Sequence, residues 1–444
     1  MQLSRALRLD GSEGPVQSLS LVGAGGKSSV LFQVASELLS ARCPGVIVTS
    51  TTHFGVWQLS IAEKHVIARG IEELEQVTGW NGVTLITGDI EGDRTGPATD
   101  EILFWLRENS LLAGIPLLIE ADGSHMHPLK APAEHEPAIP GFSEAVVVVA
   151  GLSALGLPLN DEFVHRANIF SKLTGSPFNE PITAEAVWKL LVHPQGGLKN
   201  IPDTARRIVV LNQADTPELQ AVGGQIAGQL LNHYDSAVVG SIRHMHFQSI
   251  ERTAGIILAA GESTRFGKPK QLLEWHGESF VRQIAKTALR AGLAPVLVVI
   301  GFHAAEVESA LKDLPVVIVH NPDYFLGQST SIRSGVQSLP KSTGSALFLL
   351  SDQPQIPGDV IHALIEAHAQ DLHPILAPLV SEEHRANPVL FDRSTFPELL
   401  KLTGDIGGRA LFDRYKVEYL PWHDESLLLD VDRPEDYKKL KEME

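Results

Sequence analysis

The chain has 444 residues, of which 43% are hydrophobic and 20% charged. This is too long for one ordinary domain, and the composition is that of a globular protein. The net charge of −17 excludes a general nucleic-acid-binding role, because acidic residues are in excess in both halves, and the single cysteine excludes an internal disulfide and a cysteine-rich metal site.

Near the start, residues 16–22 predict a strand, residues 23–29 (GAGGKSS) a glycine-rich turn, and residues 30–39 a helix. A Lys-Ser pair at the start of such a helix is typical of a phosphate-binding loop. Leu21 stands where the full signature has glycine, so a tight turn that binds nothing is the alternative. We predict a nucleotide site at Gly23, Gly25, Gly26, Lys27 and Ser28.

Apolar runs at residues 46–48 and 117–119 predict buried parallel strands. Hydroxyl side chains follow the first run, and Glu120 and Asp122 follow the second. Carboxylates at that edge of a sheet can hold Mg²⁺ beside a phosphate, so Asp122 joins the predicted nucleotide site, with capping as the alternative. Downstream, His125, His127 and His135 could form a metal site, but their proline-rich spacing favours a surface loop.

Two further apolar runs, at residues 145–150 and 207–211, predict more strands. The first half resembles the selenium-dependent hydroxylase accessory (YqeC-like) family. The motifs are VGAGGKSS at 22–29, TSTTHF at 49–54, IEADGSHMHPLKAPAEHEPAIP at 119–140, GLSALGLPLNDEFVHR at 151–166 and LNQAD at 211–215. The resemblance implies a nucleotide-binding-like α/β domain linked to the maturation of molybdenum hydroxylases.

Residues 241–253 are polar and lack a strong period, so we expect a short joint between two domains. After it, strands and helices alternate. The predicted strands are 254–260, 295–300, 315–319, 345–350 and 375–378, and the predicted helices are 279–291, 304–311, 330–339 and 359–370. This order predicts βαβ units around a mainly parallel sheet.

The stretch GIILAAGESTRFGKPK at residues 255–270 is a buried strand that runs into a glycine-containing turn with three cations. Backbone amides and cations aimed at one point suit a triphosphate. Asp352 follows the predicted strand 345–350 and could hold a divalent metal beside that loop, or simply begin a turn. Asp432, after an apolar run at 427–429 that we read as a strand with Asp430 just beyond it, could hold metal or cap the last helix.

The pattern LAAG-x3-R-x-G-x2-K resembles the sugar- and cofactor-nucleotidyltransferase superfamily, and most closely the molybdenum cofactor cytidylyltransferases (MocA-like). Supporting segments are KQLLEWHGES at 270–279, NPDYFLGQSTSIRSGV at 321–336, LLSDQPQIP at 349–357, RANPVLFDRSTFPELLKLTGDIGGRALF at 385–412 and LDVDRPEDY at 429–437. We therefore predict an α/β protein of two domains, each a mainly parallel sheet flanked by helices. Residues 1–245 form the YqeC-like domain with a variant phosphate loop, and residues 250–444 a Rossmann-like, GT-A-like nucleotidyltransferase domain.

The resemblance assigns roles to individual residues. Catalytic residues would be Arg265, Lys270 and Asp352, and Mg²⁺ (or Mn²⁺) ligands Asp352 and Asp432. The nucleotide would be held by Leu258, Ala259, Ala260, Gly261, Arg265, Gly267, Lys270, Gly327, Gln328, Ser329 and Ser331. The acceptor would be held by Arg385, Asn387 and Pro388, although Ala386 stands where the family usually has glycine, which puts the acceptor in question.

The expected reaction transfers CMP from CTP to the molybdopterin-bound molybdenum cofactor and releases pyrophosphate. Transfer of this kind needs no protein nucleophile, only positioning and charge stabilisation. One alternative is the same chemistry with GTP or another acceptor. A second, of another class, is a cofactor-insertion chaperone in which the first domain is an NTPase. Partners would be small molecules and, transiently, a molybdenum hydroxylase apoprotein, with no nucleic acid and no membrane. The absence of a signal-peptide core and of a long apolar run predicts a cytoplasmic location.

Overall fold

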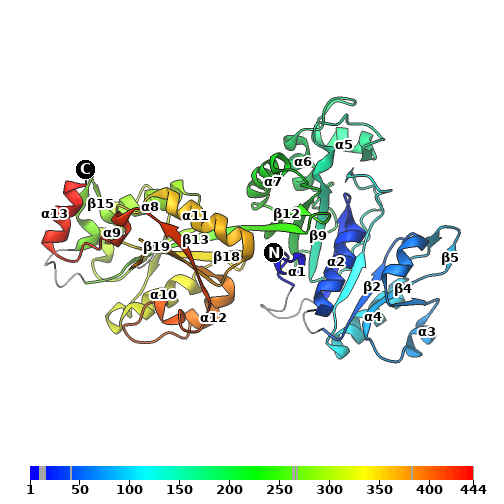
Figure 1. Ribbon diagram of the computed structural model, residues 1–444, viewed down its shortest axis with the longest axis horizontal. Helices are drawn as coiled ribbons and strands as arrows, with labels where there is room; N and C mark the ends of the chain where they lie inside the picture. The colour runs from blue at the N-terminus through cyan, green and yellow to red at the C-terminus, as the bar shows by residue number, and fades with distance from the viewer. Residues whose placement is uncertain (10–16, 41–42, 263–265, 267–268, 382–383, 444) are drawn as a thin grey trace. The chain divides into compact units, whose positions relative to one another are not determined.

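The computed structural model describes residues 1–9, 17–40, 43–262, 266, 269–381 and 384–443. The chain forms two compact units, Met1–Ile250 and Glu251–Glu444. Both units are α/β, with sheets flanked by helices (Figure 1), which confirms the predicted fold class. None of the helices that the structure describes is both long and apolar enough to cross a bilayer.

Among the described residues, the first unit is built on a sheet in the order β13-β12-β11-β9-β1-β7-β2-β4-β3, to which β13 (His246–Ala259) contributes its first residues. The strands from β12 to β3 are all parallel to their neighbours. The strands are β1 (Ser18–Gly23), β2 (Gly45–Ser50), β3 (Lys64–Ile67), β4 (Gly82–Thr87), β7 (Leu117–Glu120), β9 (Ala145–Gly151), β11 (Arg206–Asn212) and β12 (Ser236–Ser241). Short pairs flank it: β5 (Ile90–Glu91) with β6 (Arg94–Thr95), and β8 (Leu129–Lys130) with β10 (Val164–His165).

Helices cover both faces of this sheet. They are α1 (Leu3–Ala6), α2 (Lys27–Ser40), α3 (Ile71–Glu75), α4 (Asp100–Ala113), α5 (Ala167–Thr174), α6 (Ala184–Val192) and α7 (Pro217–Leu230). Strand β9 shows the alternation that a two-sided sheet requires. Val146 and Val148 pack into the core with α5, α6 and α7, whereas Val147 and Val149 pack into the core with α1 and α2.

The second unit has a mixed sheet in the order β17-β16-β13-β18-β21-β19, with β20 and β22 both paired to β19. Its strands are β13 (His246–Ala259), which includes the unit boundary, β16 (Val296–Ile300), β17 (Val317–His320), β18 (Thr343–Leu350), β19 (Ile375–Val380), β20 (His384–Arg385), β21 (Val389–Asp392) and β22 (Val417–Trp422). A separate hairpin joins β14 (Glu274–Trp275) to β15 (Glu278–Ser279). Strands β13, β16, β17 and β18 are mutually parallel, while β21 is antiparallel to its neighbours.

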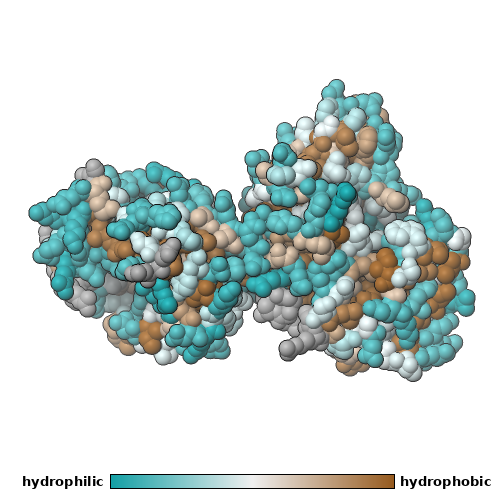
Figure 2. Space-filling model, in the orientation of Figure 1, coloured by the Kyte–Doolittle hydropathy of each residue, from teal (hydrophilic) through white to brown (hydrophobic). Residues whose placement is uncertain are grey.

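The α-helices that the structure describes beside the second sheet are α8 (Phe280–Arg290), α9 (Ala304–Leu311), α10 (Gln328–Gln337), α11 (Gly358–Asp371), α12 (Phe396–Leu399) and α13 (Pro434–Glu442). Helices α8, α9 and α11 pack on one face, and α10 and α12 on the other. On the face drawn in Figure 2, apolar residues are interspersed with hydrophilic ones over both units. The predicted helices and strands between residues 254 and 378 all exist, with shifted ends.

Two predicted segments differ from the structure. Residues 246–253, expected to be part of a joint, belong to strand β13, because Phe247 and Ser249 alternate inward and are buried despite the polar sequence. The run at 427–429 is not a strand: Glu425–Leu428 forms a 3-10 turn. The Asp424 carboxylate accepts a hydrogen bond from the Ser426 amide, which starts that turn, and only Leu427 is fully buried.

Candidate functional site

The glycine-rich loop of the first unit connects β1 to α2 and is pressed against β9. Gly23, Gly25 and Gly26 have φ values of +96°, +84° and +105°. A Cβ on Gly23 would lie 2.2 Å from the Val149 carbonyl oxygen, and one on Gly25 would lie 2.3 Å from the Gly151 nitrogen. Close backbone approach and left-handed geometry therefore explain these glycines without a ligand.

Three amides of this loop already have protein acceptors. The Gly23 N–H donates to both carboxylate oxygens of Asp122, at 3.1 and 3.0 Å. The Ala24 N–H donates to the Val149 carbonyl at 2.8 Å, and the Gly25 N–H to the His127 carbonyl at 3.0 Å. These three donors are therefore directed into the protein rather than towards a phosphate.

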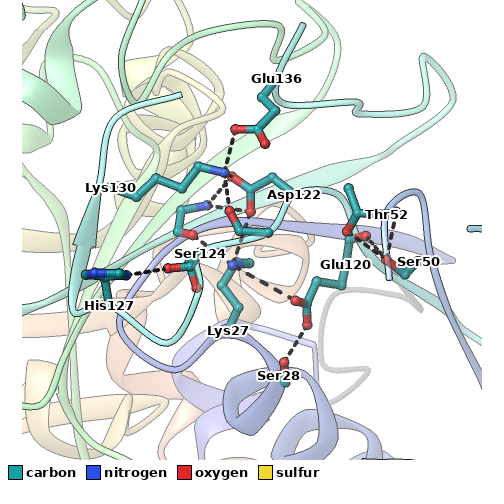
Figure 3. A network of polar contacts seen from close by, with 12 residues as sticks. Lys27, Ser28, Ser50, Thr52, Glu120, Asp122, Ser124, His127, Lys130 and Glu136 are labelled. Atoms are coloured by element: carbon teal, nitrogen blue, oxygen red, sulfur yellow. Dashed lines mark hydrogen bonds and ion pairs between the residues drawn. The ribbon is translucent and has the colours of Figure 1, made fainter. Parts of the chain in front are cut away.

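The Lys-Ser pair also points inward, as Figure 3 shows. Lys27 Nζ donates to the Gly23 carbonyl at 2.8 Å and lies 3.2 Å from Asp122 and 4.0 Å from Glu120. The Ser28 hydroxyl donates to Glu120 at 2.7 Å. Because the Lys27 side chain is only 2% exposed, this ammonium is part of a buried ion-pair cluster.

The cluster continues through Lys130, whose Nζ lies 2.9 Å from Asp122 and 2.7 Å from Glu136, to Arg166, 2.6 Å from Glu136. Burial opposes ionisation of Glu136, but hydrogen bonds from Arg166 and Lys130 outweigh it and lower its pKa to about 2. Burial raises the pKa of Glu120, against the opposing effect of Lys27. The cavity bordered by Gly23, Asp122 and Lys130 holds about 30 Å³, room for roughly one water.

The histidine-rich stretch lies in a loop next to β10. The His125 and His127 rings lie 4.6 and 5.7 Å from the His165 ring, between centroids. His127 Nε2 is 2.9 Å from the Asp161 carbonyl oxygen. Burial, helped by Arg166, lowers the pKa of His165 to about 4. In the part of the chain that the structure describes, no group of three or more His, Cys, Asp and Glu is arranged to hold a metal ion.

The second unit carries an open cleft of about 590 Å³ at the end of β13. Leu258, Ala260, Gly261 and Lys270 line it, and Ala259 is buried beneath. Gln271 fixes the start of the loop: its Nε2 donates to the carbonyls of Ala259 at 3.2 Å and Gly261 at 2.7 Å. The predicted residues Arg265 and Gly267, with Lys268, lie outside the described residues.

Lys270 joins the two predicted metal ligands. Its Nζ donates to Asp352 at 3.0 Å and to Asp432 at 2.7 Å. Burial tends to lower the pKa of Lys270, but the Asp352 and Asp432 carboxylates raise it above its usual value. The Asp432 side chain is 48% exposed and that of Asp352 23%, so the group faces the cleft.

Asp432 does not cap the last helix. The N-cap of α13 is Arg433, whose amide donates to the Asp436 carboxylate at 3.0 Å. The capping alternative for Asp432 is therefore wrong. The N-cap residue is one position later in the chain, and the carboxylate that accepts the hydrogen bond from its amide belongs to Asp436 in the first turn of the helix. Asp432 is instead directed at Lys270, as described above.

The chemistry of this carboxylate pair fits a divalent cation. Oxygens of Asp352 and Asp432 converge on one ammonium nitrogen, and carboxylate oxygens are the hard donors that Mg²⁺ and Mn²⁺ prefer. Two protein carboxylates plus substrate phosphates are a usual Mg²⁺ environment. The pair is therefore able to hold such an ion.

The predicted base and ribose segment forms one wall of the cleft. Gly327 has φ +110°, and a Cβ there would lie 2.6 Å from the Asp405 Cα. Gln328 and Ser331 line the cleft, and the backbone N–H of Gln328 donates a hydrogen bond to the Asp405 carboxylate at 3.1 Å. Ser329 is fully buried, and its hydroxyl donates to the Gly404 carbonyl at 2.6 Å, so it secures the 404–405 loop.

A second cavity of about 300 Å³ shares Leu258, Gln328 and Leu350 with the cleft. Asn387 lines it, next to Pro388 in the chain. The other lining residues are Ile332, Phe348, Val389, Phe391, Gly407, Gly408, Arg409 and Asp430. The cavity thus combines an apolar wall with a few polar groups, as small-molecule sites do.

The other residues of the predicted acceptor segment, Arg385, Ala386 and Pro388, are not among the residues that line this cavity. The Arg385 guanidinium carbon lies 5.8 Å from the Phe412 ring centroid and 5.5 Å from that of Tyr419. Ala386 is buried in the core with α8, α9 and α11. The alanine that departs from the family pattern thus adds its methyl group to the core and not to the cavity wall.

Sequence reasoning missed Asp405 and Arg409 and left Asp430 without a definite role. Burial and the Asp352 and Asp432 carboxylates raise the pKa of Asp430 to about 6, and Arg409 opposes them. The Gln353 amide donates to Asp430 at 2.5 Å. The available signal was the run GDIGGR at 404–409, in which paired glycines precede an arginine, but it follows no strand and therefore gave no prediction.

Two family models match the chain. The YqeC protein model matches residues 19–168, and the MobA-like NTP transferase domain model matches residues 255–419. An uncharacterized YqeC protein of Escherichia coli is 32% identical over 228 residues, which are 50% of this chain and 85% of that protein.

Relatives of the second half carry different names. A nicotine blue oxidoreductase of Paenarthrobacter nicotinovorans is 30% identical and aligns over 42% of this chain and 95% of its own length. The molybdenum cofactor cytidylyltransferase of Escherichia coli is 26% identical over 42% of this chain and 94% of its own length. The chain therefore belongs to the YqeC family in its first half and to the MobA-like NTP transferase family in its second half.

Proposed function

We propose that the second unit transfers CMP from CTP to the molybdopterin-bound molybdenum cofactor and releases pyrophosphate. Membership of the MobA-like family supports nucleotidyl transfer, and the likeness to a cytidylyltransferase supports this nucleotide and acceptor. The observation that carries the proposal is the convergence of Lys270, Asp352 and Asp432 in a cleft that adjoins a second cavity. One cavity for each substrate, side by side, suits a reaction between two small molecules.

In this reaction an oxygen of the acceptor's terminal phosphate attacks the α-phosphorus of CTP. The bond from the α-phosphorus to the bridging oxygen breaks, and pyrophosphate leaves with the electron pair. Lys270 would stabilise the negative charge that spreads over the phosphates, as would Arg265. Asp352 and Asp432 would hold Mg²⁺, which supplies further charge neutralisation when bound.

The remaining residues of the second unit would position the substrates. We propose that the 258–261 strand end and the segment at 327–331 hold the nucleotide, with Ser329 acting through the 404–405 loop. Asn387, which lines the second cavity, would border the acceptor, with its neighbour Pro388 holding it in place. We propose residues 1–245 and 250–444 as the two functional domains, a division that lies within a few residues of the boundary between the compact units.

For the first unit we infer an accessory role after transfer, such as delivery of the finished cofactor to a molybdenum hydroxylase. The MobA-like transferase model matches residues 255–419 and the YqeC model residues 19–168, which supports a role of the first unit apart from the transfer itself. The nucleotide site at Gly23–Ser28 and Asp122 stays a proposal. It would require Lys27 to leave its buried carboxylate partners when a phosphate arrives.

The test is pyrophosphate release by the full chain, with Mg²⁺, the molybdenum-loaded pterin and one nucleotide at a time. We expect release with CTP and little with GTP, ATP or UTP; release with GTP only would refute the choice of CTP. The variant Asp352→Ala should lose this release. If that variant still supported full maturation of a molybdenum hydroxylase, a cofactor-insertion chaperone would become the better account.

A further inference from the structure

Carboxylates lie in and beside the second cavity, and the predicted acceptor residues place no cation among its lining. It opens beside the Asp352 and Asp432 carboxylates and is itself lined by Asp430. An acceptor that ends in a phosphate monoester brings up to two further negative charges to this place. Like charges at such short range are strongly unfavourable unless a cation faces them.

Two cations near this place have other partners. Lys270 is shared between Asp352 and Asp432 on the nucleotide side. Arg385, which the resemblance assigns to the acceptor, lies over the Phe412 and Tyr419 rings. A guanidinium stacked in this way gains cation–π energy that it would lose on turning away.

Arg409 is the cation that lines the second cavity, and no other Lys or Arg does so among the described lining residues. Its side chain is exposed, and Nη2 donates to Asn387 Oδ1 at 3.2 Å. The loop before it can come close to the cavity because Gly407 and Gly408 lack side chains. A Cβ at Gly407 would lie 2.7 Å from Gln328 Oε1, and one at Gly408 would lie 2.8 Å from the Phe391 ring.

We propose that Arg409 binds the terminal phosphate of the acceptor and, with Asn387, presents it to the nucleotide cleft. The inference rests on the proposed function for the existence of a phosphorylated acceptor, and deepens it by naming the residue that recognises that phosphate. A guanidinium suits this role because its fork of N–H donors matches two phosphate oxygens. The apolar wall of Ile332, Phe348 and Phe391 would take the flat ring of the acceptor.

The experiment measures binding without turnover, by calorimetric titration of the full chain. The probes are a 6-substituted pterin with a phosphate monoester on its side chain and the same pterin without the phosphate. The wild-type protein should prefer the phosphorylated probe by roughly 10- to 100-fold, the range of a hydrogen bond to a charged group. Arg409→Ala should bind the two probes alike, and Arg409→Lys should keep part of the preference.

A matched control is Arg414→Ala, an arginine of the same segment that is paired with Glu398 at 2.9 Å on the surface. It should keep the full preference. The proposal is overturned if Arg409→Ala retains the preference, or if Arg385→Ala abolishes it and Arg409→Ala does not. Kinetics give a second readout: Arg409→Ala should raise the KM for the acceptor far more than the KM for CTP, and the reverse result would assign Arg409 to the nucleotide.

The failure of this inference differs from the failure of the proposed function. If no nucleotide yields pyrophosphate with the wild-type chain, the transfer reaction is wrong, whatever the titration gives. If pyrophosphate appears but the phosphate preference does not depend on Arg409, the reaction stands and this residue's role is wrong.

Discussion

The two units present the same local pattern with opposite outcomes. In each, a buried parallel strand runs into a glycine-containing turn with a lysine beyond it, Lys27 in one and Lys270 in the other. Lys27 is 2% exposed and held by Asp122 and the Gly23 carbonyl, beside a void of about 30 Å³. Lys270 is 17% exposed and held by two carboxylates that face a cleft of about 590 Å³.

The difference comes from what surrounds each turn. In the first unit, β9 and the loop after β7 supply carbonyls and carboxylates that take up the turn's donors. In the second unit, the walls of the cleft stand further apart and leave Lys270 and its partners facing open space. Close backbone approach explains the glycines of the first turn, whereas a Cβ on Gly261 in the second would meet nothing within 4 Å. A glycine-containing turn with a lysine therefore does not by itself predict a ligand site, because the surrounding loops decide whether a ligand can enter.

The largest expected effect is on the open site, by which we mean the cleft around Lys270, Asp352 and Asp432. Lys270→Met should lower kcat for pyrophosphate release by about 10²- to 10³-fold, because it removes a cation directed at the developing charge. Steady-state kinetics of the full chain measure this. Lys439→Met, an exposed lysine on α13, is the control and should leave kcat unchanged. A kcat within about twofold of wild type in Lys270→Met would mean that this lysine is not part of the transfer site.

Substitutions in the closed site, the buried ion-pair cluster around Lys27, should change the stability of the fold rather than the transfer activity. Lys27→Met leaves Glu120 and Asp122 buried with fewer cations, so the free energy of unfolding should fall by about 3 kcal/mol. Urea unfolding measures it, and Lys189→Met, in an exposed pair with Glu185 on α6, should change it by less than about 0.5 kcal/mol. An unchanged stability in Lys27→Met would show that the buried pairs are not structural.

The pKa of Glu136 makes the closed site sensitive to acid. A lowered pKa means that the charged form stabilises the fold above the ordinary pKa of about 4.5, and that this stabilisation disappears as pH falls towards about 2. At pH 7 the free energy of unfolding of the wild type should therefore exceed that of Glu136→Gln by roughly 1–2 kcal/mol, a value reduced because the group is partly exposed. This difference should disappear between about pH 4.5 and 2. Unfolding curves across that range measure the gap, and a constant gap would contradict the prediction.

The smallest effect concerns the support of the open loop. Gln271→Ala removes two hydrogen bonds to the carbonyls of Ala259 and Gly261, so the KM for the nucleotide should rise by about fivefold with little change in kcat. Gln283→Ala, which removes a similar bond to the Trp275 carbonyl away from the cleft, is the control. Equal KM values for the two variants would show that Gln271 has no part in nucleotide binding.

Much of the fold follows from the sequence. Residues 145–150 and 296–300 are β-branched or apolar throughout, which is typical of strands buried on both faces, and both are strands. Strand β13 begins earlier than predicted, because its first residues are polar and only their alternation marks them as buried. The segment at 425–428 was mispredicted because three leucines do not reveal that a side-chain cap would start a turn.

The sites were harder to predict than the elements. Asp352 and Asp432 lie far apart in the chain, yet both lie beside Lys270. Asp352 was expected near the loop because it follows a strand that ends at the same edge of the sheet, whereas Asp432 was placed there only by the family resemblance. The inward direction of Lys27 could not be expected, since it depends on Asp122 and on the carbonyls of another strand. Arg409 lies in a short 3-10 helix, Gly408–Leu411, that follows a glycine-rich run and no strand, so the strand-end rule that located the other site residues does not apply to it.

The central claim is that nucleotidyl transfer takes place in the second unit and not at the glycine-rich loop of the first. The most direct measurement follows CTP labelled at its α-phosphorus, incubated with Mg²⁺, the molybdenum-loaded pterin and the full chain. We expect the label to move to the pterin with wild type and with Lys27→Met, and not to move with Asp352→Asn. Label transfer that survives in Asp352→Asn, or that is lost in a folded Lys27→Met protein, would contradict it.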